Sequence, residues 1–97
     1  MSTTAARRAR TVVRQSQQVV AIELLTAASA LEHRLAEGGR VALGRGTRCA
    51  LQEVQQVLAQ AGELPSDEIA ALAEAVGEGR VVSAVESVIG SLPEVFP

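Results

Sequence analysis

The stretch TTAARRARTVVRQSQQVVAIELLTAASALEHRLA, residues 3–36, decides the fold. At 100° per residue its spacing predicts one long helix with an apolar stripe along one face. The stripe consists of Val13, Val20, Leu24, Ala27, Leu31 and Leu35. Val12 and Val19 widen it, whereas Ile22 and Leu25 fall on the far side. The middle of the helix is thus apolar almost all round, which is typical of a helix surrounded by others.

Turn residues divide the remaining sequence into three shorter helices. Gly38 and Gly39 end the long helix, and residues 37–46 form a glycine-rich loop. We expect helices over about 47–61, 66–76 and 80–89, with Thr47 and Ser66 as N-caps of the first two. An extended tail covers residues 90–97. No segment alternates long enough for a strand, so the prediction is an all-α fold, with residues 1–97 as a single helical domain.

The composition limits the partners of such a chain. Almost half of the 97 residues are apolar and Phe96 is the single aromatic residue, which favours closely approached helices. A net charge of −2 does not favour nucleic acid. The apolar run over residues 19–31 is too short and too polar to cross a bilayer, and no secretory signal precedes it. We therefore expect no nucleic-acid or membrane partner, and a cytoplasmic location.

Residues that could carry chemistry are few. Cys49 is alone, so it cannot form an intrachain disulfide, and we expect it to be a small buried apolar residue. His33 lies one turn before Glu37, as a surface histidine near a helix end does. The stretch GRVALGRGT, residues 39–47, lacks the lysine of a phosphate-binding loop. The prediction is therefore no catalytic, cofactor-binding or metal-binding residue in this chain.

Four arginines occupy the start of the long helix. Arg7, Arg8, Arg10 and Arg14 precede the first carboxylate, Glu23, although cations near a helix N-terminus oppose its dipole. The helix could begin upstream on another polypeptide, or the arginines could meet acidic residues of a partner, or they could bind phosphate backbones. An ordinary solvated face is the fourth interpretation.

Glu23 is the one charged residue within the apolar stretch over residues 19–31. A carboxylate among apolar groups must form a pair or shift its pKa upward. Glu23 therefore either occupies the exposed angle of the helix or forms an ion pair with an arginine of another chain.

The order of residues adds a resemblance to a family. VAIELLTAASAL, residues 20–31, together with Ala6, Arg7 and Ala9, resembles the C-terminal helical region of the aromatic amino-acid ammonia-lyases and aminomutases. Downstream, LGRGTRCALQEV, LPSDEIAALAEAVGEGRV and AVESVIG look like later helices of the same region. The resemblance covers nearly the whole chain.

The resemblance implies a helical homotetramer whose electrophile, methylidene-imidazolone, forms from an internal Ala-Ser-Gly, with a tyrosine as base. This chain has neither; its nearest string is Ala28-Ser29-Ala30. The family's Gln-Glu motif lies just before the position of Met1, so by adjacency only residues 1–4 come near a catalytic centre. The prosthetic group is therefore expected on a partner chain.

The hypothesis is a non-catalytic small subunit of a two-chain ammonia-lyase-like or aminomutase-like enzyme. Its helices would pack into a larger multi-chain bundle, in a hetero-oligomer with a tetrameric core. The expected subunit interface comprises Arg7, Val13, Val20, Ile22, Glu23, Leu24, Leu25 and Leu31. The alternatives are a stand-alone helical dimerisation module and an arginine-armed nucleic-acid-binding protein.

Overall fold

A computed structural model of the chain describes residues 2–38 and 42–93. It contains helices α1 (Thr3–Ala36), α2 (Arg45–Gln60), α3 (Pro65–Gly77) and α4 (Arg80–Ile89), and the described residues include no strand. The predicted all-α fold, with one long helix before three shorter ones, is confirmed. The expectations for Met1, for residues 39–41 of the loop and for residues 94–97 of the tail lie outside the described residues.

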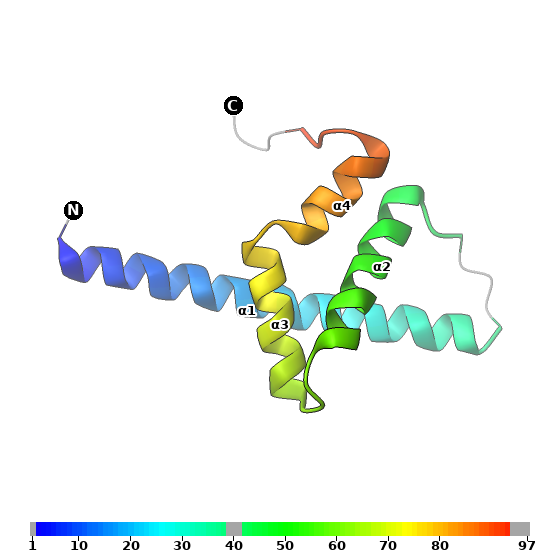
Figure 1. The fold of residues 1–97 in the computed structure, drawn as a ribbon, viewed down its shortest axis with the longest axis horizontal. Helices are drawn as coiled ribbons and strands as arrows, with labels where there is room; N and C mark the ends of the chain where they lie inside the picture. Colours follow the sequence, from blue (N-terminus) through cyan, green and yellow to red (C-terminus); the bar gives the residue numbers. More distant parts are fainter. Residues whose placement is uncertain (1, 39–41, 94–97) are drawn as a thin grey trace.

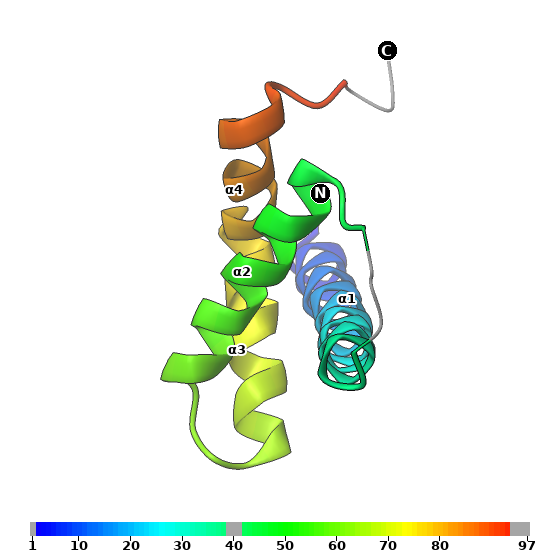
Figure 2. The same ribbon diagram turned by 90° about the vertical axis from the view of Figure 1, so that its right-hand side faces the viewer.

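The helices form two layers. Helix α1 makes up one layer alone, and α2, α3 and α4 make up the other (Figures 1 and 2). Helix α3 crosses α1 near its middle, whereas α4 packs on α2 and α3 and does not contact α1. The N-terminal half of α1 therefore projects beyond the other helices (Figure 1). The molecule measures 54 × 37 × 18 Å.

Local interactions fix both ends of α1. The Ala5 amide donates a hydrogen bond of 3.1 Å to the Ser2 hydroxyl, which makes Ser2 the N-cap. At the other end Gly38 has φ +78°, a left-handed conformation that a glycine adopts without steric cost. The chain thus leaves α1 where the sequence predicts.

Two predicted N-caps are wrong. Helix α2 begins at Arg45, two residues earlier than expected, so Gly44 and not Thr47 is its N-cap. Helix α3 begins at Pro65. Proline is favoured in the first helical position, because the N–H of that residue has no acceptor within the helix and its absence costs nothing. The carboxylate of Asp67 accepts a hydrogen bond from the Leu64 amide at 3.2 Å, so the capping group lies within the first turn and not on Ser66.

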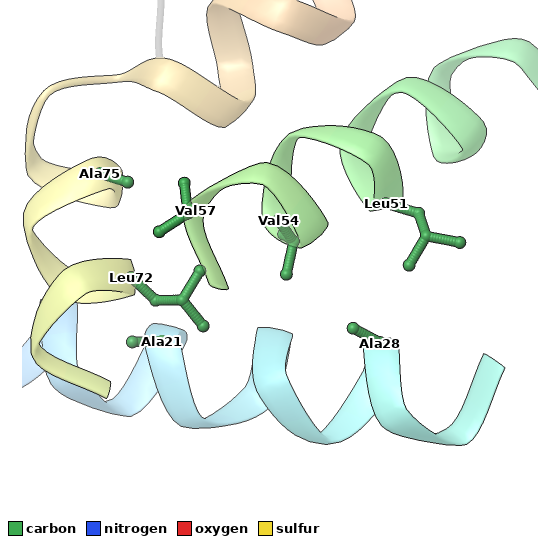
Figure 3. Close-up of a cluster of buried hydrophobic side chains, with 7 residues drawn as sticks. All are labelled: Ala21, Ala28, Leu51, Val54, Val57, Leu72 and Ala75. Carbon is green, nitrogen blue, oxygen red and sulfur yellow. The ribbon is translucent and has the colours of Figure 1, made fainter. Parts of the chain in front are cut away.

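A small core lies where α2 and α3 meet α1. Figure 3 shows Leu72 beside Ala21, and Leu51 above Ala28. Leu72 and Ala21 are both fully buried. The buried cluster consists of Ala21, Ala28, Leu51, Val54, Val57, Leu72 and Ala75. Three of the seven are alanines, which agrees with closely approached helices.

The buried face of α1 is not the predicted stripe. The chain buries Ala21 and Ala28, which lie about 80° and 60° around the helix from the centre of the stripe of large side chains. An alanine lets the backbone of a crossing helix come closer than a leucine or valine does. Packing within the chain therefore uses the small residues, and the large side chains remain beside the contact or outside it.

Charged and glycine residues hold α4 against α2. The Arg80 guanidinium forms an ion pair with the Glu53 carboxylate, with an Nη2–Oε1 distance of 2.8 Å, and Arg45 donates a hydrogen bond to the Val88 carbonyl. A Cβ added at Gly46 would lie 3.4 Å from the Val85 side chain, so the helices approach closely there. These contacts couple the two ends of α4 to α2.

Gly79, between α3 and α4, gives a test of this arrangement. Its φ is +72°, so Gly79→Ala is expected to lower the free energy of unfolding by about 1 kcal/mol, because an L side chain is strained in this conformation. Gly44→Ala is the matched control, since Gly44 has φ −62° and space around it. Its effect should stay within about 0.5 kcal/mol. Urea unfolding of the full chain in an osmolyte that keeps it folded measures both; equal losses would contradict the expectation.

Candidate subunit interface

Helix α1 carries an apolar surface that the chain does not cover. Only Ala21 and Ala28 of the helix are buried. Val12 is 60% exposed and Ile22 is 47% exposed, although Ile22 lies in the middle of the helix. We call the following residues the uncovered apolar surface: Val12, Val13, Val19, Val20, Ile22 and Leu35. The first five lie on the flanks and back of α1, and Leu35 lies at its C-terminal end, away from α3.

The size of the exposed surface shows how incomplete the packing is. The chain exposes 7225 Å², whereas a compact monomer of its mass, 10.1 kDa, exposes about 5,300 Å². The radius of gyration is 15.5 Å, compared with about 12.5 Å for a compact domain of this length. The excess of about 1,900 Å² exceeds what one partner contributes to an interface of standard size, about 800 Å².

A partly open apolar groove runs between α1 and α2. Its α1 side comprises Leu24, Ala27, Ala28 and Leu31, and its α2 side comprises Thr47, Ala50, Leu51 and Val54. The two helices diverge from their crossing point, so side chains of this chain fill the groove incompletely (Figure 1). An apolar side chain of another helix could enter it without breaking a contact of this chain.

The eight predicted interface residues fall into two groups. The exposed group consists of Arg7, Val13, Val20, Ile22 and Glu23. The second group is half-buried against the chain's own core and consists of Leu24, Leu25 and Leu31. In the described part of the chain Glu23 forms no ion pair. The structure thus places five of the eight where another chain could reach them.

Further exposed apolar residues extend beyond the predicted set. Val12 and Val19 lie on the back of α1. Their spacing along the helix already places them on the side opposite Ala21 and Ala28. Ile89 at the end of α4 is 49% exposed, although a Cβ added at Gly46 of α2 would lie 3.6 Å from its side chain. Val82 is exposed on the same helix.

The two reactive side chains that the sequence offers, His33 and Cys49, lie in different helices, α1 and α2. His33 lies 3.2 Å from Glu37, and both side chains are exposed at the end of α1. Cys49 is only half-buried, less than expected. Residues 2–38 and 42–93 contain no cluster of three possible metal ligands. Within the same ranges, no helix is long and apolar enough to cross a membrane.

The prosthetic group implied by the resemblance does not fit this chain. It requires Ala-Ser-Gly in a segment free to cyclise, but Ser29 is followed by Ala30, and both lie within the unbroken helix α1. The chain also contains no tyrosine. No reaction step can therefore be assigned to its residues.

Comparison with known proteins identifies relatives over nearly the full chain. The histidine ammonia-lyase of Symbiobacterium thermophilum is 43% identical over 94 residues, and those of Natranaerobius thermophilus and Gloeobacter violaceus are 39% and 35% identical. Each alignment covers 95% of this chain but 18% of the relative, so the chain spans about a fifth of the length of these enzymes. No family model and no solved structure matches the chain.

Proposed function

We propose that this chain, which is homologous to one segment of the ammonia-lyase family, completes the helical bundle of a two-chain ammonia-lyase-like or aminomutase-like enzyme. In this proposal the chain is a non-catalytic small subunit. A larger partner chain supplies the methylidene-imidazolone group, the base and the substrate pocket, and the complex has a tetrameric core. The names of the relatives make histidine the first substrate to test.

The observation that supports this proposal most strongly is the uncovered apolar surface of α1. A helix of 34 residues that buries two residues within its own chain needs other helices to remove its apolar side chains from water. Exposed apolar surface of this extent marks a site of association. The groove between α1 and α2 adds a second place where a partner helix fits.

The structural role follows from what the chain has and lacks. When bound in such enzymes, the prosthetic group acts as an electrophile toward the amino acid, but this chain supplies neither its precursor nor a tyrosine. Its helices instead exclude water from partner helices and hold them in position. A substitution on the uncovered apolar surface should therefore affect assembly first and activity as a consequence.

Co-purification tests the proposal directly. The chain, tagged and purified from its source organism, should bring with it a larger chain that contains Ala-Ser-Gly, and the complex should release ammonia from histidine or another amino acid. Intact mass spectrometry of both chains measures whether they are separate polypeptides. A chain that purifies without any larger partner would overturn the proposal.

The isolated chain should be less stable than the chain in its complex. We expect it to be weakly helical or to self-associate, because the seven buried residues in the described part of the chain form a small core to offset the conformational entropy of folding. Circular dichroism and sedimentation velocity over a range of concentrations measure this. A stable, monodisperse monomer would contradict the expectation.

A stand-alone dimer is the second candidate. The same apolar side chains of α1 could pack against a second copy of α1, which would also bury Ile22 and the valines beside it. A concentration-independent homodimer that associates with no larger chain would favour this alternative.

A further inference from the structure

Three of the arginines continue the face of α1 that α3 covers. At 100° per residue, Arg7, Arg10 and Arg14 lie within about 40° of Ala21, the fully buried residue of α1. The cover provided by this chain ends near Gln17, because a Cβ on Gly77 at the end of α3 would lie 2.9 Å from the Gln17 side chain. The arginines therefore follow directly beyond the edge of α3.

These arginines have no acidic counterpart in the described part of the chain. Its ion pairs there join His33 to Glu37 and Arg80 to Glu53, and all three arginines are exposed. Positive charge in the first turns also opposes the helix dipole. The chain has a formal net charge of −2, and no carboxylate occurs before Glu23. Residues 1–22 therefore have a formal net charge of +4, and the remaining residues have one of −6.

The surface beside Arg10 and Arg14 is shallowly concave, as a surface that receives side chains of a partner is. A shallow hollow on α1 is lined by Ala9, Arg10, Val13, Arg14 and Gln17. On the helical wheel Ala9 and Val13 form the apolar side of this hollow, and Arg10 and Arg14 form the other side. Guanidinium binds carboxylate through two parallel hydrogen bonds, and arginine is favoured over lysine in interfaces of this kind.

We infer that Arg7, Arg10 and Arg14, here called the arginine face, bind carboxylates of an acidic helix on the larger chain, seated beside the end of α3. The inference rests on the proposed function, which supplies the larger chain, and it adds the chemistry of the partner surface. The net −6 of the remaining residues repels any anion, but a phosphate backbone extends over more of that surface than the carboxylates of one helix, so carboxylates fit better.

A charge reversal with a matched control tests the arginine face. Arg10→Glu should weaken binding of the larger chain about 30-fold or more, as expected for an interfacial charge that loses its partner. Arg8→Glu makes the same change two residues away, on the opposite side of α1, and should alter binding less than about threefold. Titration of the purified larger chain at two salt concentrations measures both. Equal losses in the two variants would overturn the inference.

The absence of lysine allows a test of position. Arg10→Lys introduces the sole side-chain amine of the chain, and a carbodiimide joins an amine to a carboxylate without a spacer. After coupling in the purified complex, mass spectrometry should find position 10 joined to an Asp or Glu of the larger chain, with no such product from Arg8→Lys. Coupling at position 8 alone, or coupling of position 10 to a second copy of this chain, would overturn the inference.

These results separate the inference from the proposed function. Co-purification of the larger chain is measured before coupling. If the complex is intact but position 10 does not couple, the inference about the arginine face is wrong and the proposed function stands. Absence of any larger chain refutes both. Retention of a DNA duplex at physiological salt, lost in Arg10→Glu, would assign the arginine face to phosphate and also overturn the inference.

Discussion

Ile22→Asp is expected to detach the chain from the larger chain. Ile22 lies in the middle of α1 on the side that no helix of this chain covers, and it is nearly half exposed. In the proposed complex the aspartate would be buried without a partner charge, which costs more than the lost apolar contact. We expect binding to weaken about 100-fold, which corresponds to about 2.7 kcal/mol. Titration of the larger chain followed by sedimentation measures the loss.

Ile22→Val is the control for this substitution. It keeps an apolar, β-branched side chain and removes one methylene, so binding should change less than about tenfold. The helical content of the separate chain should be the same in both variants within the contribution of one residue, because Ile22 contributes little to the chain's own core. Unchanged binding of Ile22→Asp would show that this side of α1 faces solvent, and the proposed interface would be wrong.

Leu72→Ala is expected to cause the largest loss of stability. Leu72 is fully buried where α3 crosses α1, and its side chain contacts the core beside Ala21 (Figure 3). Truncation of a buried leucine to alanine lowers the free energy of unfolding by about 2–5 kcal/mol, through lost burial and the cavity that remains. With a core this small, such a loss should separate α3 from α1. Urea unfolding of the full chain in an osmolyte measures the change.

Leu64→Ala provides the matched control for Leu72→Ala. It is the same chemical change eight residues away, but Leu64 is 63% exposed at the turn before α3. We expect a change within about 0.5 kcal/mol. If both substitutions lowered stability equally, the core at the α1–α3 crossing would not be the element that holds the chain together.

The helices themselves could be predicted from the sequence because their signals are local. Apolar spacing and the turn glycines define α1, and α4 begins and ends at the expected residues, Arg80 and Ile89. The N-caps were harder to predict, since each helix start has two competing candidates: Gly44 and Thr47 for α2, and Leu64 and Ser66 for α3. At the start of α3 the proline and the Asp67 carboxylate outweigh the hydroxyl of Ser66.

The contact face of α1 could not be predicted from hydrophobicity. A stripe of valines and leucines signals burial, but the helices that cross α1 select small residues, with α3 over Ala21 and α2 over Ala28. The stripe therefore predicts which residues need cover without saying which chain provides it. The residues of a partner are not encoded in this sequence, so the interface remains a proposal that Ile22 and the arginine face can test.

The thickness of the molecule has a consequence for its life in the cell. At 18 Å it is two helices deep, since one helix with its side chains is about 10 Å across. Every helix therefore borders solvent on one side, and local opening exposes its backbone to proteolysis. An orphan copy should be degraded quickly, so the amount that accumulates would be set by the supply of its partner and not by its own rate of synthesis.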